Sequence, residues 1–301
     1  MKILKILKDL YANLVRTKWQ LGFVLGGIET VMSNDKLDVT WVKSRYKDRW
    51  FADPFILNIT DKDIILLVEE FPYSTKKGII SKLTISRKSF EITERKTILD
   101  LPTHLSFPNI YRLDDKIYIY PENCRSGKLD IYEYNKNTDE LTKIQTICKD
   151  CIWDSCIVEN FGSPKLFTAK SNDYFLDIYS WNKEKGLFEN PTSIKFDTKT
   201  ARMAGNMFEH NGSIYYPSQN CTKSYGQAVV IRKIEYNAES NKFNFEFIKE
   251  LKSTHPTLKE GMHTLNSYKD IVVIDVIGYE NPFLGKLGHK ILKLIKHGRN
   301  N

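Results

Sequence analysis

The 301-residue chain lacks any run of about 18 consecutive apolar residues, so the sequence predicts no transmembrane helix. The nearest stretch, Leu21 to Ile28, is shorter and carries three glycines. We also expect no secretory signal, because Lys5 and Lys8 interrupt the apolar stretch that a signal requires. There is no zinc-finger spacing, no RNA-binding aromatic motif and no long basic arm, so we expect no nucleic-acid partner.

Cysteine is scarce. The five cysteines are Cys124, Cys148, Cys151, Cys156 and Cys221. An odd number without a signal peptide predicts free thiols in a reducing compartment, which is consistent with a cytoplasmic location. Cys148 and Cys151 have CxxC spacing, but neither a second ligand pair nor a βαβ context accompanies them. The sequence therefore predicts ordinary thiols, no metal and no cofactor.

The composition is that of a soluble globular protein, with 41% hydrophobic and 27% charged residues. Aromatic residues make up 12%, with 16 Tyr and 16 Phe, which favours strands over helical bundles. The 45 Lys and Arg exceed the 37 Asp and Glu, giving a net charge of +8. Such an excess suits an anionic partner, for example a membrane surface or a phosphorylated substrate.

Both ends of the chain have the pattern of short basic amphipathic helices. In residues 1–16 and 281–301, apolar residues recur at helical spacing with lysines between them. Such helices lie readily on anionic lipid, which predicts peripheral attachment at the inner face of the cell membrane. The alternative is that each helix packs on the body of the protein. We divide the chain into a lead-in at 1–35, a central domain at 36–280 and a tail at 281–301.

The central domain repeats pairs of strands, and each pair begins near a polar residue. These first residues are Asp53, His104, Asp154, Arg202 and His263, which lie 51, 50, 48 and 61 residues apart. A period near 50 residues with several strands per unit is typical of a β-propeller. The sequence therefore predicts an all-β fold, a five-bladed propeller with short helical extensions at both ends.

The propeller architecture predicts a polar funnel. The innermost strand of each blade lines the central channel, so the residues that open these strands meet at one mouth. Antiparallel pairing returns the second strand to the same face, where its last residues add a second ring. The members of this second ring are Glu69, Glu122, Lys170 and Gln219.

The predicted ring has the residue types that carbohydrate chemistry uses. Paired carboxylates, here among Asp53, Glu69, Glu122 and Asp154, serve glycosyl transfer or hydrolysis as base or nucleophile and as acid. We expect the remaining polar residues to bind substrate, with a phosphate or carboxylate held by the cations and sugar rings stacked on the aromatics. These residues are Trp50, His104, Trp153, Lys170, Arg202, Gln219, Tyr225 and His263. The alternative is that an Asp before Pro caps a turn and a Glu after a strand is simply solvated.

Several motifs resemble the N-terminal propeller domain of the glucosamine inositolphosphorylceramide transferases. They are Trp50-Phe51-Ala52-Asp53-Pro54-Phe55, Val68-Glu69-Glu70-Phe71, His104-Leu105-Ser106-Phe107-Pro108, Tyr118-Ile119-Tyr120-Pro121-Glu122, Asp154-Ser155-Cys156-Ile157, Ala201-Arg202-Met203-Ala204-Gly205, Gln219-Asn220-Cys221 and Gly261-Met262-His263. In order and spacing the resemblance covers roughly residues 19–280. It implies a carbohydrate ligand and a glycan or glycolipid pathway.

A more distant resemblance connects the Ala-Asp-Pro-Phe segment and Asp154 to the five-bladed arabinanases, invertases and levansucrases. This resemblance implies that Asp53 is base or nucleophile and that Asp154 orients the substrate. The general acid of those hydrolases comes from a later blade, whereas the fourth blade here begins with Arg202. Glu122 or Glu69 would then be the acid, and an Arg in its place fits an anionic substrate.

Three hypotheses follow. The first is glycosyl transfer in the synthesis of a surface polysaccharide or glycolipid, with a sugar or nucleotide-sugar as substrate. The second is a furanosidase-type hydrolase, which would release free sugar without an acceptor. The third is a propeller that binds glycans without turnover.

Overall fold

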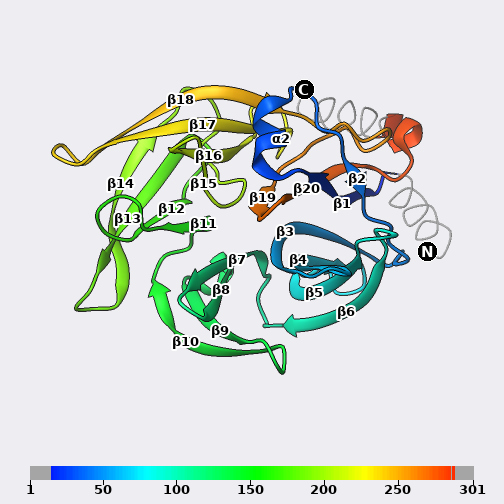
Figure 1. Cartoon of the computed structure of the whole chain (residues 1–301), viewed down its shortest axis with the longest axis horizontal. Helices are drawn as coiled ribbons and strands as arrows, with labels where there is room; N and C mark the ends of the chain where they lie inside the picture. The colour runs from blue at the N-terminus through cyan, green and yellow to red at the C-terminus, as the bar shows by residue number, and fades with distance from the viewer. Residues whose placement is uncertain (1–14, 286, 289–301) are drawn as a thin grey trace, which may run out of the picture.

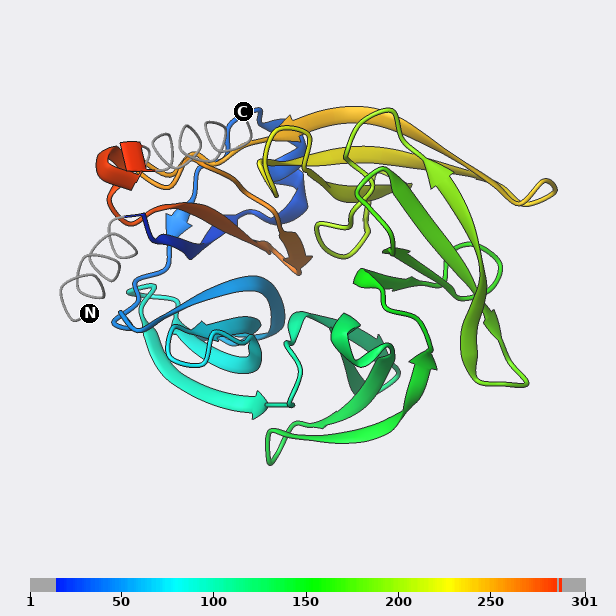
Figure 2. The ribbon, with the colours of Figure 1, turned by 180° about the vertical axis from the view of Figure 1, so that it is seen from behind.

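Short apolar stretches separated by turns fold into strands that pair with their sequence neighbours. The computed structural model describes residues 15–285 and 287–288, and its strands form five four-stranded sheets arranged in a ring (Figures 1 and 2). Neighbouring strands within each sheet pair antiparallel, as short turns between consecutive strands require. The predicted five-bladed propeller is confirmed. The amphipathic helices predicted at the two ends fall mainly on residues 1–14 and 289–301, outside the described residues.

The first three blades each use four consecutive strands. Blade 1 contains β3 (Arg49–Ile59), β4 (Asp63–Pro72), β5 (Ile79–Ser86) and β6 (Ile92–Leu99). Blade 2 contains β7 (Ser106–Leu113), β8 (Lys116–Glu122), β9 (Leu129–Asn135) and β10 (Glu140–Cys148). Blade 3 contains β11 (Trp153–Val158), β12 (Lys165–Ala169), β13 (Phe175–Asn182) and β14 (Leu187–Lys195).

Blade 4 is assembled in the same way as the first three blades, whereas blade 5 is not. Blade 4 again uses consecutive strands, β15 (Phe208–His210), β16 (Ser213–Asn220), β17 (Ala228–Asn237) and β18 (Lys242–Leu251). Blade 5 combines strands from both ends of the chain, β19 (Leu265–Tyr268), β20 (Ile271–Tyr279), β1 (Thr17–Leu25) and β2 (Thr40–Trp41). The described residues also form helix α2 (Gly27–Ser33) and a 3₁₀ turn at Cys124–Ser126.

Blade 5 closes the ring. Strand β1 pairs with β20 along its whole length, from Thr17 opposite Tyr279 to Leu25 opposite Ile271. The propeller therefore begins at β1, inside the segment that the sequence assigned to a lead-in before residue 36. The sequence pattern missed this strand because its partner, β20, lies at the other end of the chain.

A bulge recurs near the start of the innermost strand in blades 1 to 3. Asp53, Phe107 and Asp154 each have a positive φ, of 49°, 43° and 46°, and each lies at a register shift in its strand pair. A bulge inserts one extra residue and turns the local side chain. His104 was predicted to open blade 2, but Phe107 occupies the position equivalent to Asp53. We expected each blade to open with a polar residue and therefore chose His104, but β7 begins only at Ser106.

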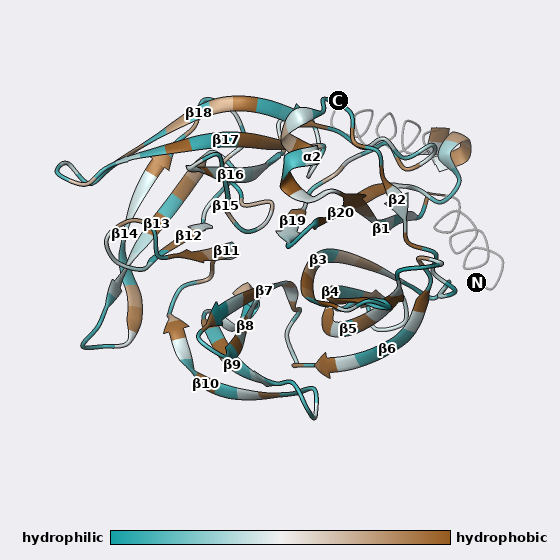
Figure 3. Cartoon of the chain, viewed as in Figure 1, coloured by the Kyte–Doolittle hydropathy of each residue, from teal (hydrophilic) through white to brown (hydrophobic). Residues whose placement is uncertain are grey.

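The core follows the inner strands around the ring. Phe55, Phe107, Phe167 and Tyr216, from blades 1 to 4, are buried in one apolar cluster. In Figure 3, β20 is strongly apolar, whereas hydrophilic residues mark much of the blade periphery. The tight inner packing gives the mouth of the propeller a rigid base.

Asparagines link the blades inside the ring. Asn109 donates to Asn206 Oδ1 at 2.6 Å, and Asn206 N donates to Asn266 Oδ1 at 2.8 Å. Asn266 in turn donates to the carbonyl of Pro54 at 2.9 Å. These hydrogen bonds satisfy polar groups that would otherwise destabilise the buried centre.

The cysteines differ from the prediction of five free thiols. A disulfide joins Cys124 to Cys151, whose Cα atoms are 4.2 Å apart, and Cys148, Cys156 and Cys221 are free and buried. The loop after β8 lies beside the loop before β11, a proximity that sequence spacing does not reveal. The thiol count therefore no longer argues for a reducing compartment.

Among the described residues, no helix combines the length and apolar character needed to cross a membrane.

Candidate functional site at the propeller mouth

One side of the mouth is built around Asp53. His263 Nε2 lies 3.3 Å from Asp53 Oδ1, and His263 Nδ1 lies 2.8 Å from Asp275 Oδ1. Asp275 Oδ2 also accepts the backbone N–H of Asp53 at 2.9 Å. All three side chains are buried, so an imidazole stands between two carboxylates with both ring nitrogens engaged.

Charge and burial act against each other in this cluster. Burial lowers the pKa of His263, but Asp275 and Asp53 outweigh it and raise that pKa to about 9. Burial raises the pKa of Asp53 well above its ordinary value, although the charge of His263 opposes the shift. Glu69, Asp154 and Asp275 add to the increase because they are negative neighbours.

The Asp53 cluster is also the group of side chains best placed to ligate a metal. One ligand atom from each of Asp53, His263 and Asp275 falls within 4.8 Å of the other two. A protonated imidazole has no free lone pair for a cation. Since the pKa of His263 is about 9, a metal would have to displace its proton. The arrangement at neutral pH is better described as an ion-pair network than as a preformed metal site.

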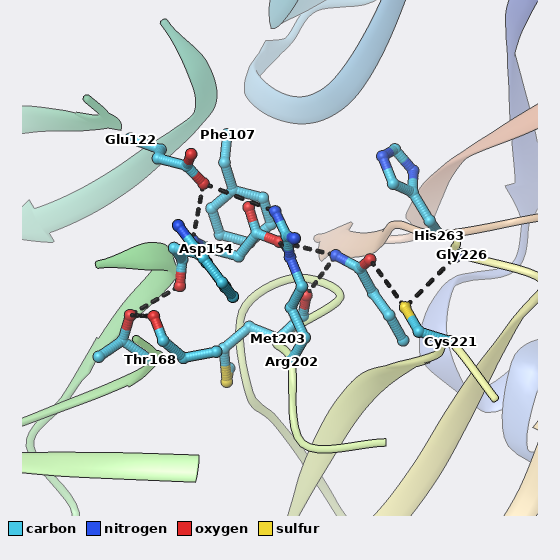
Figure 4. Close-up of polar contacts among 12 residues, drawn as sticks. Phe107, Glu122, Asp154, Thr168, Arg202, Met203, Cys221, Gly226 and His263 are labelled. Atoms are coloured by element: carbon cyan, nitrogen blue, oxygen red, sulfur yellow. Dashed lines mark hydrogen bonds and ion pairs between the residues drawn. The ribbon is translucent and has the colours of Figure 1, made fainter. Parts of the chain in front are cut away.

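The other side of the mouth is built around Asp154. Arg202 Nε donates to Asp154 Oδ2, and Gln219 Nε2 donates to the same oxygen at 2.7 Å (Figure 4). Glu122 Oε2 accepts the backbone N–H of Asp154 at 3.1 Å and lies 3.8 Å from Arg202 Nη2. Figure 4 shows Arg202 beside both carboxylates, with His263 farther round the mouth.

Arg202 remains charged in this setting. Burial by itself lowers the pKa of Arg202, but Asp154, Tyr225 and Glu122 raise it well above its ordinary value. Burial raises the pKa of Glu122, and the neighbouring Asp154 raises it further, against the effect of Arg202. Glu122 therefore holds a proton more readily than an ordinary glutamate does.

Glu69 and His104 form a third pair at the mouth. His104 Nε2 lies 3.2 Å from Glu69 Oε1, and His104 Nδ1 accepts the N–H of Gly78 at 2.9 Å. A side chain at Gly78 would come within 2.3 Å of the Leu105 carbonyl, so glycine is required there. Burial raises the pKa of Glu69 despite the opposing effect of His104.

Aromatic rings surround these polar groups. The Arg202 guanidinium lies 5.3 Å from the Trp153 ring and 5.2 Å from the Tyr225 ring. Tyr225 also meets the ring of His263 edge-on at 5.5 Å, and its side of the mouth is open, since 49% of the residue is exposed. Trp50 stacks on Phe71 at 4.7 Å. Flat, partly open rings beside hydrogen-bonding groups form a surface to which a sugar ring can bind.

The structure brings together all but one of the predicted site residues. Lys170 is the exception, because its ammonium pairs with Asp150 at 2.8 Å and both side chains are partly exposed. In blades 1 and 2, Glu69 and Glu122 pair with Ala52 and Ser106, but in blade 3 the residue opposite Trp153 is Ala169. Lys170 is thus one residue beyond the equivalent position, which turns its side chain to the other face.

Two residues of the site were missed from the sequence. Asp275 is fully buried in β20, and the available signal was a lone acid inside an apolar strand. Trp19 stacks on His263 with ring centres 4.0 Å apart. It lies in β1, which the sequence did not place in the propeller.

This fold and this mouth define a five-bladed propeller with a buried carboxylate ring, and comparison with known proteins identifies its family. Residues 37–269 match the family described as glucosamine inositolphosphorylceramide transferase 1, N-terminal. The chain belongs to this family, as the sequence motifs implied.

The similar curated proteins are plant enzymes. Glucosamine inositolphosphorylceramide transferase 1 from Oryza sativa subsp. japonica is 28% identical over 200 residues, which cover 63% of this chain and 27% of the relative. The protein of the same name from Arabidopsis thaliana is 28% identical over 209 residues, covering 65% and 27%. The matched part of the chain thus spans about a quarter of the length of these relatives.

Solved structures with a similar fold include sugar-processing enzymes. The β-xylosidase/α-arabinofuranosidase CoXyl43 from a compost metagenome, in complex with xylotriose, matches with a TM-score of 0.52 and 10% identity over 79% of this chain and 93% of its own. The GH43_1 enzyme from Xanthomonas citri complexed with xylose gives 0.51 and 10%, over 73% and 79%. At this identity the likeness shows the fold alone.

Proposed function

We propose that the propeller mouth binds a sugar unit of a glycolipid or surface glycan. The observation that carries the proposal is the position of Arg202 between the rings of Trp153 and Tyr225. The guanidinium places hydrogen-bond donors for hydroxyl groups next to two aromatic side chains against which a sugar ring can pack.

The buried carboxylates support this role by holding the binding groups in place. Asp154 and Gln219 form hydrogen bonds with each other, and Asp154 fixes Arg202. Asp53 and Asp275 likewise fix His263, against which Tyr225 packs. A binding group that is already fixed loses little entropy when the ligand arrives.

The comparisons favour the same class of ligand. The plant relatives are named for glucosamine and inositolphosphorylceramide, and the two GH43 structures contain xylotriose and xylose. A carbohydrate-related propeller agrees with all of these names. Glucosamine linked to inositol is therefore the first probe to use, with xylotriose as the second.

Calorimetric titration of the purified chain tests the proposal. The variant Tyr225→Ala removes an aromatic wall that has no ion-pair role, and we expect roughly a tenfold loss of affinity for glucosaminyl-inositol. Phe247→Ala is the matched control, since Phe247 is 60% exposed on the outer strand β18. Equal affinity in wild type and Tyr225→Ala would contradict binding at the mouth.

A second candidate is glycosyl transfer at the same mouth, and the raised pKa of Glu122 favours it. A carboxyl whose pKa is raised by burial holds its proton more readily, which suits general-acid catalysis. In this scheme Asp53 is the base or nucleophile, Asp154 orients the substrate and Glu122 or Glu69 is the acid. The donor would be a nucleotide-sugar.

Product analysis separates the candidate functions. Transfer from a nucleotide-sugar to glucosaminyl-inositol or a lipid acceptor, lost in Asp53→Asn and Glu122→Gln, would establish a transferase. Release of free sugar without an acceptor would indicate a hydrolase. Saturable binding by the wild type without either product would support binding without catalysis.

We also propose that the protein attaches peripherally to the cytoplasmic face of a membrane. Among the described residues, Phe283, Leu284 and Leu287 are 80%, 45% and 48% exposed beside the basic C-terminal segment. Deleting residues 286–301 should weaken binding to anionic vesicles in a flotation assay while the propeller stays folded. Unchanged flotation would show that this segment is not the anchor.

A further inference from the structure

The disulfide lies at the rim of the mouth, where blade 2 meets blade 3. Cys124 follows two residues after Glu122, the last residue of β8, and Cys151 comes two residues before Trp153, the first residue of β11. Neither cysteine belongs to a strand, since Cys124 begins the 3₁₀ turn and Cys151 lies in the loop before β11. The bond therefore joins the two segments that carry Glu122 and Trp153 to the mouth.

Hydrogen bonds cross the same junction. Trp153 Nε1 donates to Cys124 Sγ at 3.3 Å. The backbone N–H of Asp154 donates to Glu122 Oε2 at 3.1 Å (Figure 4). Because β8 and β11 belong to different sheets, side chains and the disulfide hold this part of the rim together in place of a backbone ladder.

The junction fixes the position of the Trp153 ring. That ring lies 5.3 Å from the Arg202 guanidinium and forms one wall of the proposed sugar site. Cys151 is two residues away along the chain, so a covalent bond at Cys151 restricts the backbone that carries the ring. When the bond opens, the ring gains freedom that a bound sugar must remove, and the affinity for the sugar falls.

The blades have other supports beside this bond. Asp150 accepts a hydrogen bond from Tyr179 Oη at 2.7 Å and another from Lys170 Nζ at 2.8 Å. Strand β11 pairs with β12 from Trp153 onward. We therefore expect opening of the disulfide to loosen residues 151–153 and to leave the propeller folded.

Solvent reaches the disulfide but not the free thiols. All five cysteines lie within the described residues, and of the bonded pair Cys151 is exposed and Cys124 half-buried. The free cysteines Cys148, Cys156 and Cys221 are buried. Burial raises the pKa of the Cys148 and Cys221 thiols to about 11 and that of the Cys156 thiol to about 12. Their reactive thiolates are therefore scarce at neutral pH, and a dissolved reductant meets the disulfide first.

We propose that Cys124 and Cys151 form a reversible redox site that controls sugar binding at the mouth, with a protein dithiol as its reductant. The closed disulfide positions Trp153, and reduction releases it. This inference rests on the proposed function for its ligand. At the cytoplasmic face proposed above, thiols are kept reduced, and a disulfide that forms there is usually catalytic or redox-sensing. Oxidation then strengthens sugar binding.

The reduction uses two electrons, which the dithiol supplies. A thiolate of the dithiol attacks Cys151 Sγ, the bond to Cys124 Sγ breaks, and Cys124 leaves as a thiolate that takes up a proton. The indole N–H of Trp153 points to that sulfur and favours the departing thiolate. The second thiol of the reductant loses its proton and attacks the mixed disulfide. Cys151 then leaves as a thiolate and is protonated, and the reductant ends as a disulfide.

Calorimetric titration with glucosaminyl-inositol tests the proposal on two forms of the chain. One form is treated with oxidised glutathione and the other with dithiothreitol, and each reagent is removed before the titration. The reduced form should bind about three- to tenfold more weakly, and reoxidation should restore the affinity. The double variant Cys124→Ser/Cys151→Ser should bind like the reduced form and respond to neither reagent. Cys156→Ser is the control and should keep the response.

Two further measurements separate positioning of Trp153 from a general effect on the fold. Trp153→Ala has already lost the wall on which the disulfide acts, so reduction should not weaken its binding further. Hydrogen exchange measured by mass spectrometry needs no ligand, and the amides of residues 151–154 should exchange faster in the reduced form. Exchange in β16 and β17 of blade 4 should stay the same.

The outcomes distinguish this proposal from the proposed function. Alkylation that finds Cys124 and Cys151 free after treatment with oxidised glutathione would overturn the redox site. Equal affinity of the oxidised and reduced forms would overturn its control of binding, as would a loss on reduction that persists in Trp153→Ala. If neither form binds the probe, the proposed function fails. Hydrogen exchange then decides alone whether the disulfide holds the Trp153 segment, and equal exchange in both forms would overturn that statement too.

Discussion

The two sides of the mouth place an aspartate on the same kind of bulge but balance it with different cations. Asp53 faces His263, and Asp154 faces Arg202. Both aspartates are buried and both have a positive φ. Because histidine can lose its proton within an accessible pH range and arginine cannot, the cation on the Asp53 side should respond to pH and the cation on the Asp154 side should not.

The largest effect is expected from removal of the permanent cation. Arg202→Ala leaves Asp154 and Glu122 buried without a positive partner, which should destabilise the fold by about 3–5 kcal/mol. Denaturant unfolding measures the change. The double variant Arg202→Ala/Asp154→Ala should recover part of the loss, and a single variant as stable as wild type would show that Arg202 balances no buried charge.

A second prediction uses pH to isolate the Asp53 side. The pKa of His263 rises from 6.5 to about 9 on folding, so its stabilisation is complete below about pH 6.5 and is lost as the pH rises through 9. Over this range the unfolding free energy should fall by about 3 kcal/mol. His263→Gln should reduce the slope in a pH series of unfolding curves, and the part that remains comes from buried carboxyls such as Asp53, whose pKa is also raised.

A third prediction concerns the residue that holds His263. Asp275→Asn removes a negative charge 2.8 Å from His263 Nδ1, so the pKa of His263 should fall by roughly 1 unit or more. Titration of the imidazole by NMR gives this value. An unchanged pKa would mean that Asp53 alone sets the charge of His263.

The smallest effect is expected outside the mouth. Lys170→Ala breaks a partly exposed pair with Asp150 and should cost under about 0.5 kcal/mol. Affinity for glucosaminyl-inositol should also be unchanged in calorimetry. A clear loss of affinity would restore Lys170 to the site, as the sequence had suggested.

The propeller and most of its mouth could be predicted because they depend on local patterns. Strand pairs with turns between them repeat along the chain, and Asp53 and Asp154 stand at equivalent points of that repeat. Errors arose where position depends on register within a strand. A bulge placed Phe107 where His104 was expected, and a shift of one residue turned Lys170 away.

Other features depend on contacts between distant parts of the chain. Trp19 reaches the mouth only because β1 pairs with β20, and Asp275 takes part only because β20 lies beside the innermost strand. The Cys124–Cys151 disulfide likewise depends on two loops that meet in space. The periodicity of a single sequence contains no information about contacts between segments that are far apart in it.

The most direct test is a crystal structure of the chain soaked with glucosaminyl-inositol. The account predicts a sugar ring at the mouth, against Tyr225 or Trp153 and hydrogen-bonded to Arg202. A sugar bound elsewhere, with Arg202 still paired only to Asp154 and Glu122, would contradict the mouth as the carbohydrate site.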